Sequence, residues 1–424
     1  MTNPASARRS PSAADSRATK YVLIATLYVA QAIPLGFFIT AMPVILRSEG
    51  LPLEYVGLFS VTAAPWLLKF LWAPLIDRYR PAWSARFGAR GHYLAWILPL
   101  QVFAAITVLG LSALDLGSHL TWIVGLAAVF MLLSATQDIA TDGLSVRALT
   151  EDERGPGNGL QVGGYYLGQV LGGGLLLWLF DSLGWSPVFW VMAVLLLMPM
   201  PWVLRFREPE TTPLAERPTV GYGAFRRFFS RPGTAGWVVL LLLFRSGETM
   251  ATFSFNQMLL ELGLGLAEIG LLAGLVYAVG ALTGSLAGGL LVARVGRRPA
   301  LLSLAALQSA AILSYLVPAG GDAGLGVLTG SLLAVSFAGG ASTAALYTAM
   351  MDASEEDSAG TDFTIQQSLC AIGPVVGTGL SGFSVAALGF GGHFVLCAAL
   401  AAGAFGLVAG IRLPSERRRE LLSA

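Results

Sequence analysis

The dominant pattern along the chain is a succession of long apolar segments separated by short polar and charged ones. Trp122–Leu133, Leu171–Phe180 and Val238–Phe244 contain no charged residue at all. A helix that crosses the hydrocarbon core of a membrane needs about 20 mostly apolar residues. Apolar periodicity therefore predicts twelve spanning helices, over residues 21–44, 55–75, 93–113, 120–143, 158–180, 186–204, 236–258, 267–292, 300–318, 324–350, 361–387 and 391–411.

The longest polar interruption, Arg205–Gly236, falls between the sixth and seventh predicted helices. It divides the chain into two halves of six helices each. We therefore expect an all-α integral membrane protein built from two six-helix bundles. The predicted parts are a disordered cytosolic tail (1–20), an N-terminal bundle (21–205), a cytoplasmic linker (206–235), a C-terminal bundle (236–412) and a second cytosolic tail (413–424).

Composition supports a membrane protein and excludes several function classes. Of the 424 residues, 55% are hydrophobic and 12% charged, whereas soluble domains carry about 25% charged residues. The basic face with interleaved aromatic residues that nucleic-acid binding requires is absent. The few histidines and cysteines are too dispersed for a metal cluster, and no nucleotide-binding loop is present. We expect no cofactor and no enzymatic activity, with an ion gradient, most simply of protons, as the energy source.

The distribution of positive charge predicts the orientation in the membrane. Lys69 and Arg245 lie within predicted helices, and Arg47 is alone on one side. All the other Lys and Arg residues, of 26 in total, lie in the tails and even-numbered loops. Positive loops stay in the cytoplasm, so both termini are expected inside, with the protein in the inner membrane.

Two similar loops suggest that the halves are duplicates. The first, after the second predicted helix, contains Asp77-Arg78, and the second contains Arg294-Val-Gly296-Arg297-Arg298. The second loop resembles the G-x-L-x-D-R-x-G-R-K-type motif of the major facilitator superfamily, with Ala293 where that family has Asp. The resemblance implies two pseudo-symmetric bundles that rock around a central cavity.

The first half carries a closer resemblance. Ala30–Gly36, Leu68–Tyr79 and Leu133–Asp142 are together similar to the AmpG-like permeases, a group that includes muropeptide permeases and ferric-siderophore permeases of the RhtX/FptX type. The match is dense over about 21–175 and thin afterwards. The stretch Gly157–Tyr165 looks more like the siderophore branch.

Charged residues inside the predicted helices are the candidate binding or coupling groups, because burying one near the bilayer centre costs at least ~2.5–3.5 kcal/mol. Lys69 lies on the second helix, Asp138 and Asp142 are one turn apart on the fourth, and Arg245 and Glu248 are three residues apart on the seventh. We expect a paired network around a polar cavity. The alternative is a set of structural ion pairs that only fix helix packing.

Uncharged polar residues complete the candidate lining of the cavity. Trp66 and Trp72 flank Lys69 and are expected to face lipid or to pack between helices, with stacking against a ligand as the alternative. Three rows of small residues, beginning at Gly164, Gly280 and Gly373, are predicted to line the interface between the halves, or else to pack helices within one half. The polar lining candidates are Tyr28, Gln31, Asn256, Gln257 and Gln367.

A gate is expected at the cytoplasmic helix ends. In the superfamily, the loop aspartate matched by Asp77 locks the outward-facing state, and the second-half loop supplies counterparts. Ordinary loop charge is the alternative explanation for the arginines of the second half. The gate candidates are Asp77, Arg78, Asp142, Arg147, Arg294 and Arg298.

These features favour a secondary active transporter that imports an anionic organic solute by alternating access. Lys69 and Arg245 supply positive charge to the cavity, and a ferric siderophore is the favoured solute. A muropeptide is the alternative, and a channel or a membrane-embedded enzyme is less favoured. A functional monomer is expected, with a possible outer-membrane or periplasmic protein that delivers the solute.

Overall fold

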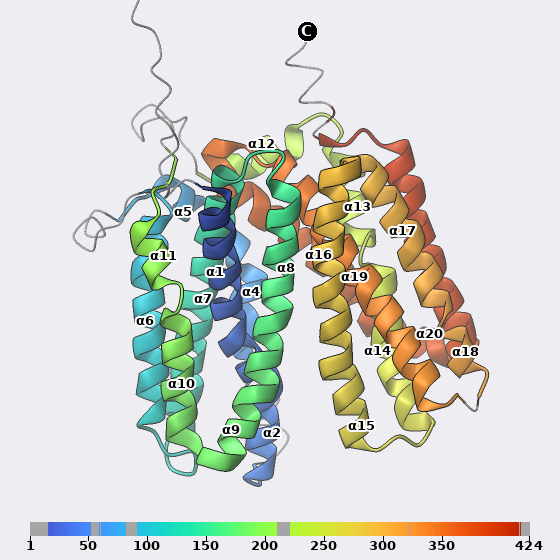
Figure 1. Cartoon of the computed structure of the whole chain (residues 1–424), viewed down its shortest axis with the longest axis horizontal. Helices are drawn as coiled ribbons and strands as arrows, with labels where there is room; N and C mark the ends of the chain where they lie inside the picture. Colours follow the sequence, from blue (N-terminus) through green and yellow to red (C-terminus); the bar gives the residue numbers. More distant parts are fainter. Residues whose placement is uncertain are drawn as a thin grey trace, which may run out of the picture.

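We analysed a computed structural model of the whole chain, which describes residues 16–51, 59, 61–81, 91–209, 221–321, 323–414 and 416. The described elements are all helical (Figure 1). Most of both predicted tails and part of the linker lie outside the described residues.

The first half is a bundle whose long helices follow the predicted apolar segments. Three of its helices contain a short π-helical or 3-10 insertion. Its elements are α1 (Arg17–Gly36), η2 (Phe37–Ala41), α2 (Met42–Ser48), η3 (Val61–Ala63), α4 (Ala64–Leu68), η4 (Lys69–Leu71), α5 (Ala73–Arg78), α6 (Leu94–Ser112), α7 (Leu120–Ala148), α8 (Arg154–Val170), η6 (Leu171–Leu175), α9 (Leu176–Leu183), α10 (Trp185–Leu197) and α11 (Met200–Arg205).

The second half repeats this organisation. A short helix, α12 (Gly223–Ser230), precedes it within the predicted linker. The remaining elements are α13 (Thr234–Leu243), α14 (Ser246–Glu261), α15 (Leu266–Gly270), η7 (Leu271–Val276), α16 (Tyr277–Val295), α17 (Arg297–Leu313), α18 (Leu316–Ala319), α19 (Leu325–Ala353), η8 (Glu356–Ser358) and α20 (Ala359–Gly410).

The described residues form twelve spanning helices in two bundles, as the sequence predicts. Ten helices are long and apolar enough to cross a membrane on their own. One of them, Glu356–Gly410, turns at Gly389, whose φ of 68° is accessible to glycine, and therefore contributes two spans. The broken helix Val61–Arg78 is the second span of the first half.

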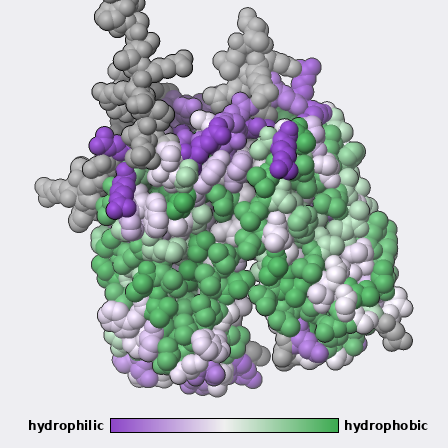
Figure 2. Space-filling model, viewed as in Figure 1, coloured by the Kyte–Doolittle hydropathy of each residue, from purple (hydrophilic) through white to green (hydrophobic). Residues whose placement is uncertain are grey.

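Both described ends of the chain lie at the same end of the molecule, which we call the terminal side (Figure 1). We call the opposite end the far side. Figure 2 shows the two halves in contact on the terminal side and separated by a gap on the far side. The same view shows an apolar belt between more polar ends, and large apolar side chains such as Trp122 and Phe383 are 69% and 77% exposed. An apolar belt of this extent is the surface of a multi-pass membrane protein.

The glycine rows pack helices within each half, so their predicted place between the halves is wrong. A Cβ on Gly168 or Gly172 would meet the α1 backbone at Val29 or Ile33, and a Cβ on Gly284 would meet the α19 backbone. A Cβ on Gly373 would likewise meet the backbone of α13, at Leu242. Small residues permit this approach because they remove side chains from one helix face.

A different row of glycines on α8 makes the contact between the halves. A Cβ on Gly155 would lie 2.7 Å from the carbonyl oxygen of Gly289 on α16, and one on Gly159 would lie 2.9 Å from that of Ser285. The sequence shows this i, i+4 spacing, but spacing does not reveal which helix faces it. These backbone contacts close the terminal side.

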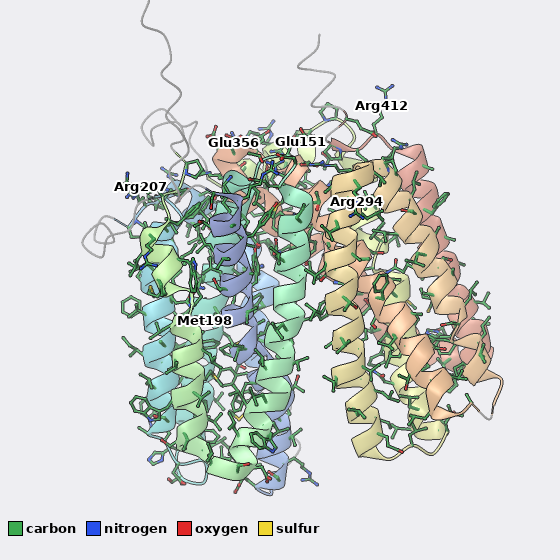
Figure 3. All side chains as sticks on the ribbon, viewed as in Figure 1. Glu151, Met198, Arg207, Arg294, Glu356 and Arg412 are labelled. Atoms are coloured by element: carbon green, nitrogen blue, oxygen red, sulfur yellow. The ribbon has the colours of Figure 1, made fainter. Side chains whose placement is uncertain are left out.

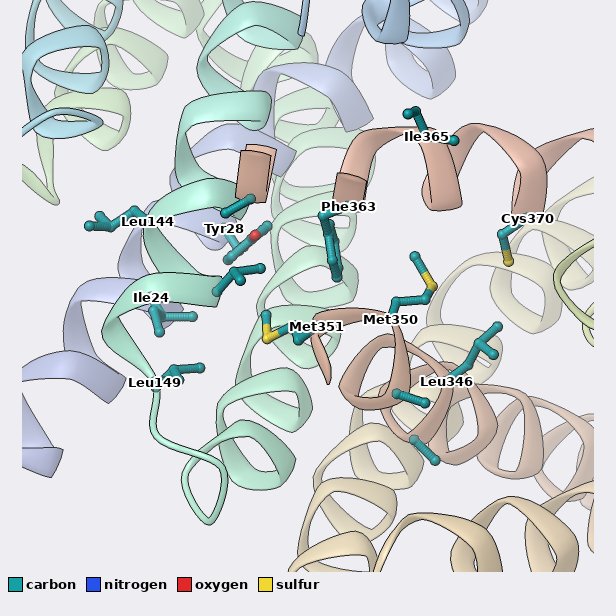
Figure 4. Close-up of a cluster of buried hydrophobic side chains, with 14 of the residues drawn as sticks. Ile24, Tyr28, Leu144, Leu149, Leu346, Met350, Met351, Phe363, Ile365 and Cys370 are labelled. Atoms are coloured by element: carbon teal, nitrogen blue, oxygen red, sulfur yellow. The ribbon is translucent and has the colours of Figure 1, made fainter. Parts of the chain in front are cut away.

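A cluster of buried apolar side chains supports the same closure. Leu144 and Leu149 of the first half belong to one cluster with Met350, Met351 and Phe363 of the second (Figure 4). Separating the halves on the terminal side would expose this cluster to water, which opposes the separation at about 25 cal/mol per Å² of apolar surface.

Candidate functional site

A cavity of about 460 Å³ lies between the two halves. Its rim includes Leu67 and Val375, which are 50% and 61% exposed. Of the predicted candidates, six line it: Tyr28, Gln31, Lys69, Asp138, Arg245 and Gln367. Other lining residues are Ala32, Ala63, Trp66, Leu67, Gln161, Val162, Tyr165, Tyr166, Thr343, Tyr347, Ser368, Ala371 and Val375.

Lys69 forms the centre of a polar cluster on the first-half wall. Its ammonium group donates to Asp138 and to Gln367 Oε1, the latter at 2.6 Å, and lies 3.9 Å from Asp142 Oδ2. Gln31 also donates to Asp138. Gln367 belongs to the second half, so this bond joins the two halves in the middle of the molecule.

A helix break places Lys69 in this position. Proline has no N–H and its ring clashes with the carbonyl four residues earlier. Pro65 and Pro74 each lie at the start of a short α-helix, and Lys69 lies between them on the 3-10 turn η4. Lys69 is 4% exposed, so stabilisation of its charge depends on the carboxylates of α7.

Asp142, one of the predicted gate residues, belongs to this cluster, and its contacts are with residues of the first half. It is fully buried, and its Oδ1 accepts from the Tyr28 hydroxyl and from Gln161 Nε2 at 3.2 Å. Asp138 and Asp142 share one face of α7, as their spacing predicts. The whole cluster is held by α1, η4, α7, α8 and α20.

Arg245 supplies positive charge on the second-half wall. It lies between α13 and α14, and its guanidinium is 3.7 Å from Glu248 at i+3, as predicted. Glu248 lies behind it, outside the cavity lining, where the Tyr277 hydroxyl donates to it at 3.0 Å. The Nε of Arg245 is buried without a hydrogen-bond partner. The Arg245 side chain lines the cavity and is 22% exposed, so part of it is accessible to a solute.

Aromatic side chains form much of the remaining wall. Trp66, Tyr165, Tyr166 and Tyr347 all line the cavity. Lys69 Nζ lies 5.3 Å from the centre of the Trp66 ring, and the indole N–H is buried without a partner. Trp66 therefore lies where the alternative, stacking against a ligand, requires it. Trp72 does pack, donating to Thr136 at 3.1 Å.

Two predicted lining residues lie elsewhere. Asn256 is half-buried and Gln257 is exposed, and neither belongs to the cavity wall. Both are more than two turns beyond Arg245 on α14, closer to the far end. Polar character inside a span indicates a lining residue only at the depth of the cavity, which the sequence does not reveal.

On the terminal side, Asp77 joins the halves. Its carboxylate accepts from the backbone N–H groups of Gly360 and Thr361 at 3.2 and 2.7 Å, at the start of α20, and from the Tyr93 hydroxyl at 2.6 Å. A carboxylate is stabilised at a helix N-terminus because unpaired N–H groups and the helix dipole meet there.

Arg147 makes a second connection. It donates to the backbone oxygen of Glu356 at 2.8 Å, across the halves, and to Glu208 at 3.3 Å. Burial raises the pKa of Glu208, although the Arg147 charge and the Tyr93 N–H oppose the shift. Figure 3 shows Glu356 at the terminal end of the molecule.

Three predicted gate arginines do not join the halves. Arg294 is exposed and forms no ion pair with any described residue (Figure 3). Arg298 pairs with Glu416 of its own half at 2.9 Å. Arg78 is exposed, with its guanidinium 5.3 Å from the Tyr79 ring.

Among the arginines of the second-half loop, Arg297 contacts the first half. It pairs with Asp352 at 2.8 Å and donates to the backbone oxygen of Glu151. Arg154 of the first half binds the same Asp352 at 2.8 Å. Asp352 therefore supplies a charge contact although Ala293 replaces the acid of the loop motif. Sequence reasoning missed Asp352 because it lies at the last turn of α19, outside any recognised motif.

No group of three metal-ligating side chains occurs among the residues that the structure describes. Cys370 and Cys397 are free and buried.

Comparisons with known proteins agree with this architecture. The sequence pattern of the Major Facilitator Superfamily matches residues 24–370 and 237–423. The chain is 30% identical over 385 residues to the anhydromuropeptide permease of Escherichia coli K12, covering 89% of this chain and 77% of that protein. It is 23% identical over 299 residues to the putative transporter AmpG 4 of Rickettsia conorii, covering 68% of this chain and 72% of that protein.

Solved structures show the same fold. The transporter FucP in its outward conformation superposes with a TM-score of 0.69 at 15% identity, covering 92% of this chain and 97% of that one. The human organic anion transporter MFSD10 superposes with a TM-score of 0.68 at 18% identity, covering 92% and 99%.

Proposed function

We propose that this chain, which belongs to the major facilitator superfamily and to its AmpG-like permeases, imports anhydromuropeptides across the inner membrane. The observation that carries the proposal is the 30% identity with an anhydromuropeptide permease over 89% of the chain. The relatives reported above do not support the siderophore branch favoured by the sequence, and they agree with its stated alternative.

The chemistry of the cavity suits such a solute. An anhydromuropeptide combines sugar rings with a peptide that carries carboxylates. Ligand sites are lined mostly by apolar and aromatic groups, with a few polar groups that orient the ligand. Trp66, Tyr165, Tyr166 and Tyr347 provide aromatic surface, and Arg245 provides a cation for a carboxylate.

Transport by such a site requires that the cavity opens to each side in turn. In the present structure the terminal side is closed by Asp77, Arg147 and Asp352, together with the glycine contacts of α8 and α16. The gap between the halves is on the far side (Figure 2). We assign this structure to the state that receives solute from the far side.

The far side is proposed to face the periplasm. Arg47, at the end of α2, lies on the far side, whereas the arginine-rich helix α12 lies on the terminal side (Figure 1). Positive segments remain in the cytoplasm, and this distribution of charge supports the proposal that both termini are inside. A cysteine at exposed Asp181 should react with an impermeant thiol reagent in intact cells, and one at exposed Arg226 only after permeabilisation; the reverse pattern would contradict the orientation.

Proton-driven symport by a monomer is the proposed mode of action. The buried acids Asp138, Asp142 and Glu248 are groups that could exchange a proton during the cycle. A delivery protein outside the inner membrane is compatible with a cavity open to the far side. The fold and the relatives are those of transporters, which disfavours a channel or an enzyme.

The proposal is tested by uptake in bacteria that lack their own muropeptide and siderophore permeases. Cells that express this chain should accumulate labelled anhydromuropeptide, and an excess of unlabelled anhydromuropeptide should compete with it. Labelled ferric siderophore serves as the comparison. Uptake of ferric siderophore without uptake of anhydromuropeptide would replace this proposal with the siderophore alternative.

A further inference from the structure

The buried cluster around Lys69 contains more negative than positive charge. Asp138 and Asp142 are 3% and 0% exposed, and Lys69 is the cation within 4 Å of them. With both carboxylates ionised, the cluster would carry one uncompensated negative charge. An unpaired charge buried away from water is strongly unfavourable, so such a group takes up a proton instead.

Buried atoms without a hydrogen-bond partner also indicate that the cluster lacks a proton. Asp142 Oδ2, Gln31 Oε1 and Gln161 Oε1 are buried and have no hydrogen-bond partner. All three are acceptors. Nearly all buried polar atoms in proteins are hydrogen-bonded. A group of buried acceptors without donors therefore indicates that a proton able to form a hydrogen bond is missing from the cluster.

Asp138 and Asp142 differ in the hydrogen bonds that their carboxylates accept. Asp138 is bonded directly by the Lys69 ammonium and by the Gln31 amide, which stabilise its ionised form. Asp142 is 3.9 Å from the ammonium, beyond hydrogen-bond distance, and its donors are neutral groups on Tyr28 and Gln161. The acid with the weaker compensation carries the proton.

Other titratable groups near Asp142 do not change this balance. Tyr28 faces it from α1, and the Tyr347 phenol approaches from α19. Tyr93 from α6 lies against neighbouring Gly143, with its hydroxyl directed to Asp77. These phenols are neutral near pH 7. Among the described side chains, Lys69 is the cation that faces Asp142.

We propose that Asp142 is the proton-binding site of this transporter, and that it holds one proton on Oδ2 while the cavity is open to the far side. The cluster is then neutral, with Lys69 and Asp138 as an ion pair beside a carboxylic acid. On release, the O–H bond of Asp142 breaks, the proton passes to water, and Lys69 is left between two carboxylates. The coupling role rests on the proposed transporter function, but occupancy of the site does not.

The position of Asp142 connects release to the movement of the halves. It lies one turn closer than Asp138 to the terminal end of α7, at Ala148. Lys69 is tied to Gln367 of the second half. Separating the halves on the terminal side would break this tie, free a donor of Lys69 for Asp142 and admit water to it. Ionisation of Asp142 is then favoured in the state open to the terminal side.

Infrared spectroscopy of the purified full-length protein tests the site without any solute. The wild type should show the C=O stretch of a protonated carboxyl at neutral pH, which shifts in D2O and disappears at high pH. Asp142→Asn should lack this signal, and Asp181→Asn, a change at an exposed aspartate, should retain it. Lys69→Gln should gain a second such signal, because no cation then compensates Asp138.

Tyr28→Phe provides a second variant that keeps Asp142 in place. Loss of the hydroxyl donor removes stabilisation of the ionised acid, so the signal should persist to higher pH than in the wild type. A wild-type signal that survives in Asp142→Asn would overturn the assignment. An unchanged pH dependence in Tyr28→Phe would also contradict it.

Transport measurements separate this inference from the identity of the solute. In vesicles, Asp142→Asn should exchange anhydromuropeptide at equal concentrations on both sides, but lose accumulation driven by a pH gradient. If the wild type fails to transport anhydromuropeptide while the infrared result holds, the solute is wrong and the proton site stands. Gradient-driven accumulation by Asp142→Asn at the wild-type level would overturn the coupling role.

Discussion

At the scale of single residues, the two cations of the cavity have different surroundings and therefore different capacities. The sequence suggested that Lys69 and Arg245 both attract an anionic solute. The structure pairs Lys69 with Asp138 and places Asp142 within 4 Å, which leaves it no net charge to offer. Arg245 has one carboxylate, Glu248, at 3.7 Å, and its side chain is 22% exposed, whereas that of Lys69 is 5% exposed. Arg245 is thus the residue that can bind a solute carboxylate.

The residue-scale prediction concerns this cation. Arg245→Gln should raise the KM for anhydromuropeptide uptake about 10- to 100-fold, because a hydrogen bond to a charged group contributes about 1.5–3 kcal/mol and about 1.4 kcal/mol is tenfold. Arg245→Lys should recover part of the loss. Arg298→Gln, which removes an arginine paired with Glu416 outside the cavity, is the control. Equal KM values in Arg245→Gln and the control would exclude Arg245 from solute binding.

At the scale of helices, α8 has two glycine faces with different functions. Gly164 and Gly168, followed by Gly172 in η6, pack against α1 within the first half, and this contact persists if each half moves as a unit. Gly155 and Gly159 pack against α16 of the other half. Only the second face must separate when the terminal side opens, so it is the face on which a side chain changes the balance between the two states.

The element-scale prediction uses Gly159→Ala. Its Cβ would lie 2.9 Å from the Ser285 carbonyl oxygen, a distance that requires the two helices to shift. The variant should therefore favour the state open on the terminal side. Spin labels at exposed Ser182 and Glu261, on the far side of the two halves, should move closer together as that side closes.

Gly174→Ala is the matched control, because a Cβ there meets nothing within 4 Å on the same spanning helix. Its label distances should equal those of the wild type. If Gly159→Ala also keeps the wild-type distribution, the α8–α16 contact does not determine which side is open.

At the scale of the whole molecule, helix count and pairs within one helix could be predicted because they depend on local spacing. The Arg245–Glu248 pair and the shared face of Asp138 and Asp142 follow from the 3.6-residue period. Contacts between helices could not be predicted in this way. Asp352 meets Arg154 and Arg297 only because the two bundles meet there, and Trp66 reaches the cavity only because its helix breaks near Lys69.

The pseudo-symmetry of the halves also explains where the charges lie. α7 and α19 each have 29 residues, so Leu120 corresponds to Leu325. On this correspondence Asp138 and Asp142 match Thr343 and Tyr347, which line the opposite wall of the cavity. The acids are thus confined to one half and the polar but uncharged counterparts to the other. This asymmetry suits a site in which one half binds protons while the other binds solute.

The most direct test of the account is accumulation by the purified protein in sealed proteoliposomes. With an inwardly directed proton gradient as the sole energy source, labelled anhydromuropeptide should accumulate above its external concentration, and dissipation of the gradient should release the excess. Asp142→Asn should equilibrate the solute without accumulating it. Equilibration by the wild type that is indifferent to the gradient, or accumulation of ferric siderophore in place of anhydromuropeptide, would contradict the account.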